Sequence, residues 1–165
     1  MATKWEIPSF LLRQIDQETY GKWLHRKAVA HVVRDRKRGN SEHAKVASYK
    51  AAIHAAVVTS QGKDAYTGER LDWRLLSRYD NKLSKEQGRA YKKGFAKLPT
   101  VDHIGDGLGK PHFVIASWRT NDAKNDLTIP EFLAVCRAVL KHHGYLVAKS
   151  RHVLDPFLLN YPRNR

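Results

Sequence analysis

The stretch that decides the fold is residues 100–128, TVDHIGDGLGKPHFVIASWRTNDAKNDLT. Its segment 112–118 is rich in residues that favour β-strands, and segment 100–104 has the length and apolar flanks of a shorter strand. Glycine and proline mark segment 105–111, between the two, as a loop. The polar run after the second strand can begin a short helix. This order of strand, loop, strand and helix predicts an α+β fold.

Two helices are predicted before this stretch. The first begins after Asp16, a residue type that can cap a helix, and it carries apolar residues at steps of three and four. It stops at Gly39. The second is expected to start from a cap at Ser41 and to continue to about Ser60. Segment 1–62 is therefore expected to be a basic helical region.

A further helix is predicted after the stretch. Thr128 and Glu131, three residues apart, form the sequence pattern of a capping box, and Gly144 can end the helix. The apolar residues of this helix recur at helical spacing, so we expect them to pack in the core; they are Phe132, Leu133, Cys136, Val139 and Leu140. Segment 145–165 keeps apolar residues and is expected to dock as a C-terminal tail.

Composition narrows the class of partner. The chain has 165 residues and a mass of 18.9 kDa, with 30 Lys and Arg against 16 Asp and Glu, a net charge of +14 and a pI of about 10.0. Such a charge favours a polyanionic partner, most commonly DNA, with RNA as an alternative. No apolar run is long enough for a membrane helix and no signal peptide begins the sequence, so we expect a cytoplasmic protein without a membrane partner. The single cysteine, Cys136, excludes an internal disulfide and a cysteine-cluster zinc site.

The positive charge is concentrated in two stretches. One is the polar side of the first helix, where the predicted nucleic-acid contacts are Arg34, Arg36, Lys37 and Arg38. The other is the insert 81–97, which has six basic residues and one acidic residue. In and after this insert the predicted contacts are Lys85, Arg89, Lys92, Lys93 and Arg119. Lysine and arginine on phosphates give affinity without sequence reading. A solvated charged face is the ordinary alternative for each stretch.

The residues that could bind a metal ion or take part in a reaction lie on the first strand and after the second. Asp102 and His103 are adjacent, so their side chains should point to opposite faces of the strand. Asp102 is a hard oxygen ligand suited to Mg²⁺ or Mn²⁺, and His103 can deprotonate water near neutral pH. Asn121 offers a neutral oxygen ligand, and Lys124, one helical turn later, can meet a phosphate. Each residue also has an ordinary structural interpretation, such as a helix cap for Asn121.

Three motifs together resemble the HNH endonuclease family: YTGE at 66–69, VDHI at 101–104 and NDAK at 121–124. The resemblance implies a small ββα-metal core within a mainly helical single domain, in segment 63–144. It implies that Asp102 and Asn121 are ligands of one divalent metal ion, most plausibly Mg²⁺. It also implies that His103 is the general base and that Lys124 is the basic residue often found three positions after the asparagine.

The sequence departs from this family in three ways. His112 occupies the place of the middle asparagine, where it could hydrogen-bond across the loop or contribute to metal binding, and we count it among the candidate catalytic residues. The paired cysteines of a structural zinc site are missing, and the insert 81–97 separates the first motif from the second. Two other functions therefore stay open: a non-catalytic nucleic-acid-binding module with a degenerate site, and a nuclease toxin or effector. Double-strand cutting usually needs two such sites, so a homodimer is a further possibility.

Overall fold

The computed structural model describes residues 5–148 and divides the chain into two compact units, with the boundary after Asp126. The first unit holds the short 3₁₀ helices η1 (Ser9–Leu11) and η2 (Trp73–Ser77) and six further elements, which are α1 (Gln17–Lys37), α2 (Val46–Ser60), α3 (Asn81–Gly94), β1 (Pro99–His103), β2 (Phe113–Ser117) and α4 (Trp118–Lys124). The second unit holds α5 (Ile129–His142). The predicted mixed α+β class is confirmed, and both predicted strands form.

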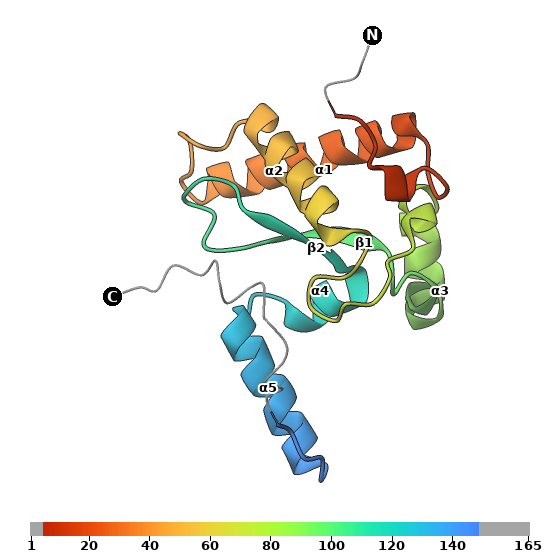
Figure 1. Cartoon of the computed structure of the whole chain (residues 1–165), viewed down its shortest axis with the longest axis vertical. Coiled ribbons are helices and arrows are strands. Elements are labelled where there is room, and N and C mark those ends of the chain that lie inside the picture. Colours follow the sequence, from red (N-terminus) through yellow and green to blue (C-terminus); the bar gives the residue numbers. More distant parts are fainter. Residues whose placement is uncertain (1–4, 149–165) are drawn as a thin grey trace. The chain divides into compact units, whose positions relative to one another are not determined.

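The strands β1 and β2 pair as an antiparallel hairpin, with Val101 opposite Ile115 and His103 opposite Phe113. A two-stranded hairpin is marginal by itself and needs other elements to cover its faces. Figure 1 shows α1 and α2 on one side of the hairpin and α4 on the other. Val101, Phe113 and Ile115 are buried on the side of α1 and α2. The hairpin is therefore held between helices that come from before and after it in the sequence.

Helix α1 begins where the sequence predicts, because the Asp16 carboxylate accepts a hydrogen bond from the backbone N–H of Thr19. Its apolar stripe is buried as expected, and the ring of Trp23 packs edge-on against that of Trp73 at 5.4 Å. The buried residues of α2 are Tyr49, Ile53 and Val57. These side chains form one core with the hairpin, so the basic helices before residue 62 are part of the same unit as the strands.

The start of α2 differs from the prediction. The helix begins at Val46, after Lys45, and Ser41 does not cap it. The reason lies in the neighbouring residue, Asn40, whose Oδ1 accepts from the backbone N–H of His43 and whose Nδ2 donates to a loop carbonyl, that of Gly107, at 2.7 Å. Residues 41–45 are thus held as a turn against the β1–β2 loop and are not part of the helix.

Helix α5 has the predicted capping box, in which Thr128 and Glu131 bond each other's backbone N–H. The prediction that its apolar stripe is core is wrong: none of its residues is buried, and Leu133, Val139 and Leu140 are at least 40% exposed. Within residues 127–148 no second helix or strand is present to cover the stripe. Of the predicted docking tail 145–165, residues 145–147 are exposed, and residues 149–165 lie outside the described part of the chain. No helix among residues 5–148 is long and apolar enough to cross a membrane.

Candidate functional site

Asp102 and His103 point to opposite sides of β1, as their adjacency in a strand predicts. Asp102 contacts Lys124 of α4, whereas the imidazole of His103 lies against the side chains of α1. Both positions are near the C-terminal end of β1, where the chain enters the loop 104–112. The two residues therefore belong to separate side-chain networks that meet at one end of one strand.

The network around Asp102 is a buried ion pair with an added hydrogen bond. Lys124 Nζ lies 3.2 Å from Asp102 Oδ2, and the two side chains are only 7% and 11% exposed. The hydroxyl of Tyr66 donates to the same oxygen, and Lys124 Nζ lies 6.0 Å from the centre of the Tyr66 ring. Lys124, which we predicted to meet a phosphate, is thus placed as the counter-charge of Asp102.

Tyr66 is brought to this network by the turn that the sequence predicts at residues 66–69. The anchor of the turn is Asp64, a buried residue whose Oδ1 accepts from the backbone N–H groups of Tyr66 and Thr67. Its Oδ2 accepts from the backbone N–H of Ser117 at 2.8 Å. Ser117 in turn caps α4 by accepting from the N–H of Thr120. One buried carboxylate therefore joins the turn, the end of β2 and the start of the helix that carries Lys124.

The network around His103 contains a second buried carboxylate, that of Asp35. Its side chain is fully buried, and its Oδ2 lies 3.2 Å from His103 Nε2. The hydroxyl of Tyr49 donates to the same oxygen at 2.6 Å. The other ring nitrogen, Nδ1, lies 3.4 Å from the carbonyl oxygen of Gly105. The Nε2 side of the His103 ring thus lies against a carboxylate that comes from α1.

Aromatic and imidazole rings close this side of the hairpin. The ring of Phe113 lies 5.0 Å from that of His103 and 4.9 Å from that of His31. Burial lowers the pKa of His31 to about 3, and the positive charges of Arg34 and Lys27 act in the same direction. His31 is therefore neutral at neutral pH and packs as part of the wall around His103.

Only part of the predicted metal ligand set is brought together. Lys124 and Tyr66 both contact Oδ2 of the Asp102 carboxylate. Asn121 is half-buried on α4, one turn before Lys124. Among residues 5–148, no group of three or more His, Cys, Asp or Glu side chains could hold a metal ion. Mg²⁺ is commonly bound by one or two protein oxygens together with water and substrate phosphate, whereas a protein zinc site uses three or four protein ligands.

His112 lies at the far end of the loop and its side chain is exposed. Its backbone carbonyl accepts from the N–H of Ile104 at 2.9 Å, which extends the hairpin by one bond. The backbone of His112 thus helps to fix the loop, and the proposed side-chain role stays a prediction.

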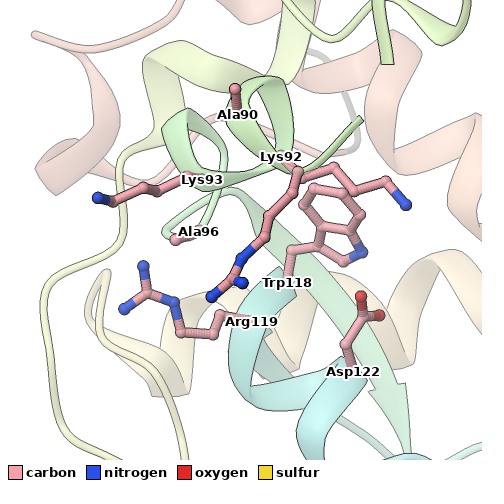
Figure 2. A pocket seen from close by; sticks show the side chains of 8 residues that line it. Ala90, Lys92, Lys93, Ala96, Trp118, Arg119 and Asp122 are labelled. Carbon is pink, nitrogen blue, oxygen red and sulfur yellow. The ribbon is translucent and has the colours of Figure 1, made fainter. Parts of the chain in front are cut away.

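A basic groove of about 680 Å³ lies between α3 and α4 (Figure 2). Figure 2 shows Lys92 and Lys93 of α3 beside Trp118, Arg119 and Asp122 of α4. The full lining is Arg89, Ala90, Lys92, Lys93, Ala96, Trp118, Arg119 and Asp122. Four cations therefore face one hollow that has a single acidic side chain.

Aromatic packing sets the position of α3 beside this groove. The Asp80 carboxylate caps the helix by accepting from the N–H groups of residues 82 and 83. The ring of Tyr79 lies 5.2 Å from that of Phe95 and 5.5 Å from that of Trp118, and Tyr91 packs on Phe95 at 4.7 Å. Tyr91 and Phe95 thus anchor this helix.

The nine predicted nucleic-acid contacts lie in three places. Those that line the groove are Arg89, Lys92, Lys93 and Arg119. Lys85 is exposed on α3 but does not line the groove. The remaining four are exposed at the C-terminal end of α1, and they are Arg34, Arg36, Lys37 and Arg38. Arg36 Nε there donates to the carbonyl of Ala44, which holds the α1–α2 connection.

No protein-family model matches the chain, and no curated protein or solved structure was found that matches it.

Proposed function

We propose that this protein is a metal-dependent endonuclease of the HNH type that hydrolyses DNA phosphodiester bonds, with β1, β2 and α4 as a ββα-metal core. The observation that carries the proposal is that the adjacent residues Asp102 and His103 contact different side chains on opposite sides of β1. His103 is backed by the buried carboxylate of Asp35, and Asp102 faces the helix that carries Asn121 and Lys124. A base that is held in place beside a hard oxygen ligand suits the hydrolysis of a phosphodiester.

His103 has the role of general base. Its Nε2 lies 3.2 Å from the buried carboxylate of Asp35, and its Nδ1 lies 3.4 Å from the carbonyl oxygen of Gly105. The imidazole takes a proton from water. The water oxygen forms a new bond to phosphorus, the P–O bond to the leaving oxygen breaks, and that oxygen takes a proton from solvent.

The protein would bind a divalent metal ion through two oxygen ligands, Asp102 Oδ1 and the Asn121 amide oxygen. A bound Mg²⁺, or Mn²⁺ in its place, would offset negative charge that develops on the phosphate. Lys124 orients the Asp102 carboxylate through the contact at 3.2 Å, and Arg119 lies in the groove on the same helix, where it can steady a phosphate.

The groove between α3 and α4 supplies the surface for the DNA backbone. Arg89, Lys92, Lys93 and Arg119 converge on it, and α3 leads directly into β1, which carries Asp102 and His103. Contacts of this kind bind phosphates without reading the sequence and weaken with salt.

A second function has an observation in its favour. Lys124 already neutralises Asp102, as expected if the site had lost its metal and the protein bound nucleic acid without cutting it. Incubation of the purified protein with supercoiled plasmid separates the two functions. Nicking with Mg²⁺ or Mn²⁺, abolished by chelator, supports the endonuclease. A salt-sensitive mobility shift without nicking supports the binding module. The same assay with RNA tests the choice of nucleic acid.

A further inference from the structure

We propose that the groove between α3 and α4 binds an unpaired nucleotide, whose base stacks on the indole ring of Trp118 and whose phosphates meet the surrounding cations. The site would then favour DNA with a single-stranded stretch, such as a bubble, a flap or an end, over a fully paired duplex. This assignment rests on the proposed nucleic-acid function of the groove and names the form of DNA that fits it.

An aromatic ring distinguishes this groove from a plain cationic surface. Trp118 lines the groove and is half-buried, so part of its ring is covered by the protein and part is accessible to a ligand. The ring of Tyr79 lies 5.5 Å from it at an interplanar angle of 80°, and Tyr79 packs in turn on Phe95. The aromatic cluster that anchors α3 therefore also holds the indole in place. Every nucleobase has a planar face that can stack on such a ring.

The base that stacks on Trp118 has to be unpaired. In a duplex the bases stack on each other and present only their edges in the two grooves, so a ring on the protein finds no free base face. In a single strand a base can leave the stack and lie flat on an aromatic side chain. The groove, at about 680 Å³, is within the size range of cavities that take small ligands, and a nucleotide is a ligand of this size.

The acidic side chain that lines the groove, Asp122, lies beside Trp118 (Figure 2). Figure 2 also shows Lys92 on the Trp118 side of the groove, and Lys93 and Arg119 on the opposite side. A carboxylate repels phosphate, so Asp122 does not suit a surface that contacts only the DNA backbone. It accepts hydrogen bonds, and every nucleobase has an N–H group on its pairing edge, which is free only in an unpaired base. Trp118 and Asp122 together therefore suit a base, and the cations suit its phosphates.

The experiment measures the binding of two labelled oligonucleotides to the full chain by fluorescence anisotropy, with chelator present so that no metal-dependent cleavage occurs. One is a single strand of about 12 nucleotides and the other is the duplex of the same length. Trp118→Leu removes the ring, and we expect its affinity for the single strand to fall by about 10-fold or more, with less than about a twofold change for the duplex. The slope of log Kd against log salt concentration should stay the same, because no cation is removed.

Three further variants separate stacking from an effect on folding. Trp118→Phe keeps a ring against Tyr79 and should retain most of the affinity for the single strand. Asp122→Ala alters an exposed side chain, so we expect the same fold and a lower affinity for the single strand relative to the duplex. Trp5→Leu is the matched control: it removes another half-buried tryptophan, which does not line the groove, and it should leave both affinities unchanged.

An unchanged affinity of Trp118→Leu for the single strand would overturn the proposal, and so would an equal loss for the single strand and the duplex. Nicking with Mg²⁺ is measured separately, on a duplex with an unpaired bubble and on the same duplex fully paired. Faster nicking of the bubble supports the proposal. If binding to the single strand depends on Trp118 but neither substrate is nicked, the endonuclease assignment fails and the base-binding site stands.

Discussion

Lys124 Nζ lies 3.2 Å from Asp102 Oδ2, with both side chains about nine-tenths buried at the contact between α4 and β1. Each charge is isolated from water and depends on the other. This ion pair holds α4 against β1. It also orients the carboxylate that we propose as a metal ligand.

Removal of one partner should therefore destabilise the fold strongly. Lys124→Met leaves the Asp102 carboxylate buried without its counter-charge, and we expect the free energy of unfolding to fall by about 3–5 kcal/mol. Adding Asp102→Leu to this variant should recover most of the loss. Urea denaturation measures both. The exposed pair of Lys22 and Glu18 is the control, since Lys22→Met should change the free energy of unfolding little. Additive losses in the double variant would contradict the coupling.

The groove should account for most of the salt dependence of DNA binding. Arg89→Ala and Lys93→Ala should each lower the slope of log Kd against log salt concentration by about 1, because each removes one phosphate contact. Lys63→Ala, an exposed residue on the turn after α2, is the control for a change in total charge. The slope is measured by fluorescence anisotropy with a labelled duplex. If Arg34→Ala lowers the slope and the groove variants do not, the DNA path lies over α1 instead.

Burial of neutral His31 should make the protein sensitive to acid. Because burial lowers its pKa from 6.5 to about 3, the unfolded state binds a proton that the folded state excludes between these values. The contribution of neutral His31 to the free energy of unfolding is therefore complete above about pH 6.5 and is lost as the pH falls toward 3. His31→Gln should reduce the slope of unfolding free energy against pH by about 1 kcal/mol per pH unit between about pH 4 and pH 6. His25→Gln, exposed on the same helix, should leave the slope unchanged; equal slopes in wild type and His31→Gln would refute the assignment.

The β1–β2 loop should tolerate substitution at one glycine far better than at another. Gly107→Ala combines a positive φ with an approach of 2.8 Å to Asp35, whereas Gly105→Ala has a positive φ of +95° and no atom within 4 Å of the added Cβ. We expect a cost of about 1–2 kcal/mol for Gly105→Ala from backbone strain, and at least about 1 kcal/mol more for Gly107→Ala from crowding. Thermal unfolding compares the two, and equal costs would show that the loop does not pack on Asp35 as described.

Local patterns predict much of this fold. The caps at Asp16 and Thr128, the stop at Gly39 and both strands depend on neighbours within a few residues, and all form as expected. The exposed stripe of α5 could not be foreseen, because amphipathic spacing shows that a helix has an apolar face and does not show whether another element covers it. The start of α2 was missed because Asn40 bonds a loop that is distant in the sequence.

The candidate site was predictable only in part, for the same reason. Asp102 and His103 follow from a short motif, but Asp35 lies within a run of basic residues, which indicates a solvated face. A signal was present: Asp35 continues the buried stripe of α1 through Ala28, His31 and Val32, so a carboxylate there had to be buried. What it contacts depends on the packing of α1 against the hairpin, which no local pattern contains.

The role of His103 as the base of a metal-dependent nuclease is tested by the nicking rate of His103→Ala beside that of the wild-type protein, with Mg²⁺ and with chelator. We expect nicking by the wild-type protein only with Mg²⁺, a loss of at least about 10²-fold in His103→Ala, and unchanged DNA binding in the variant. Equal nicking rates in the two proteins, or nicking by the wild-type protein that persists in chelator, would contradict it.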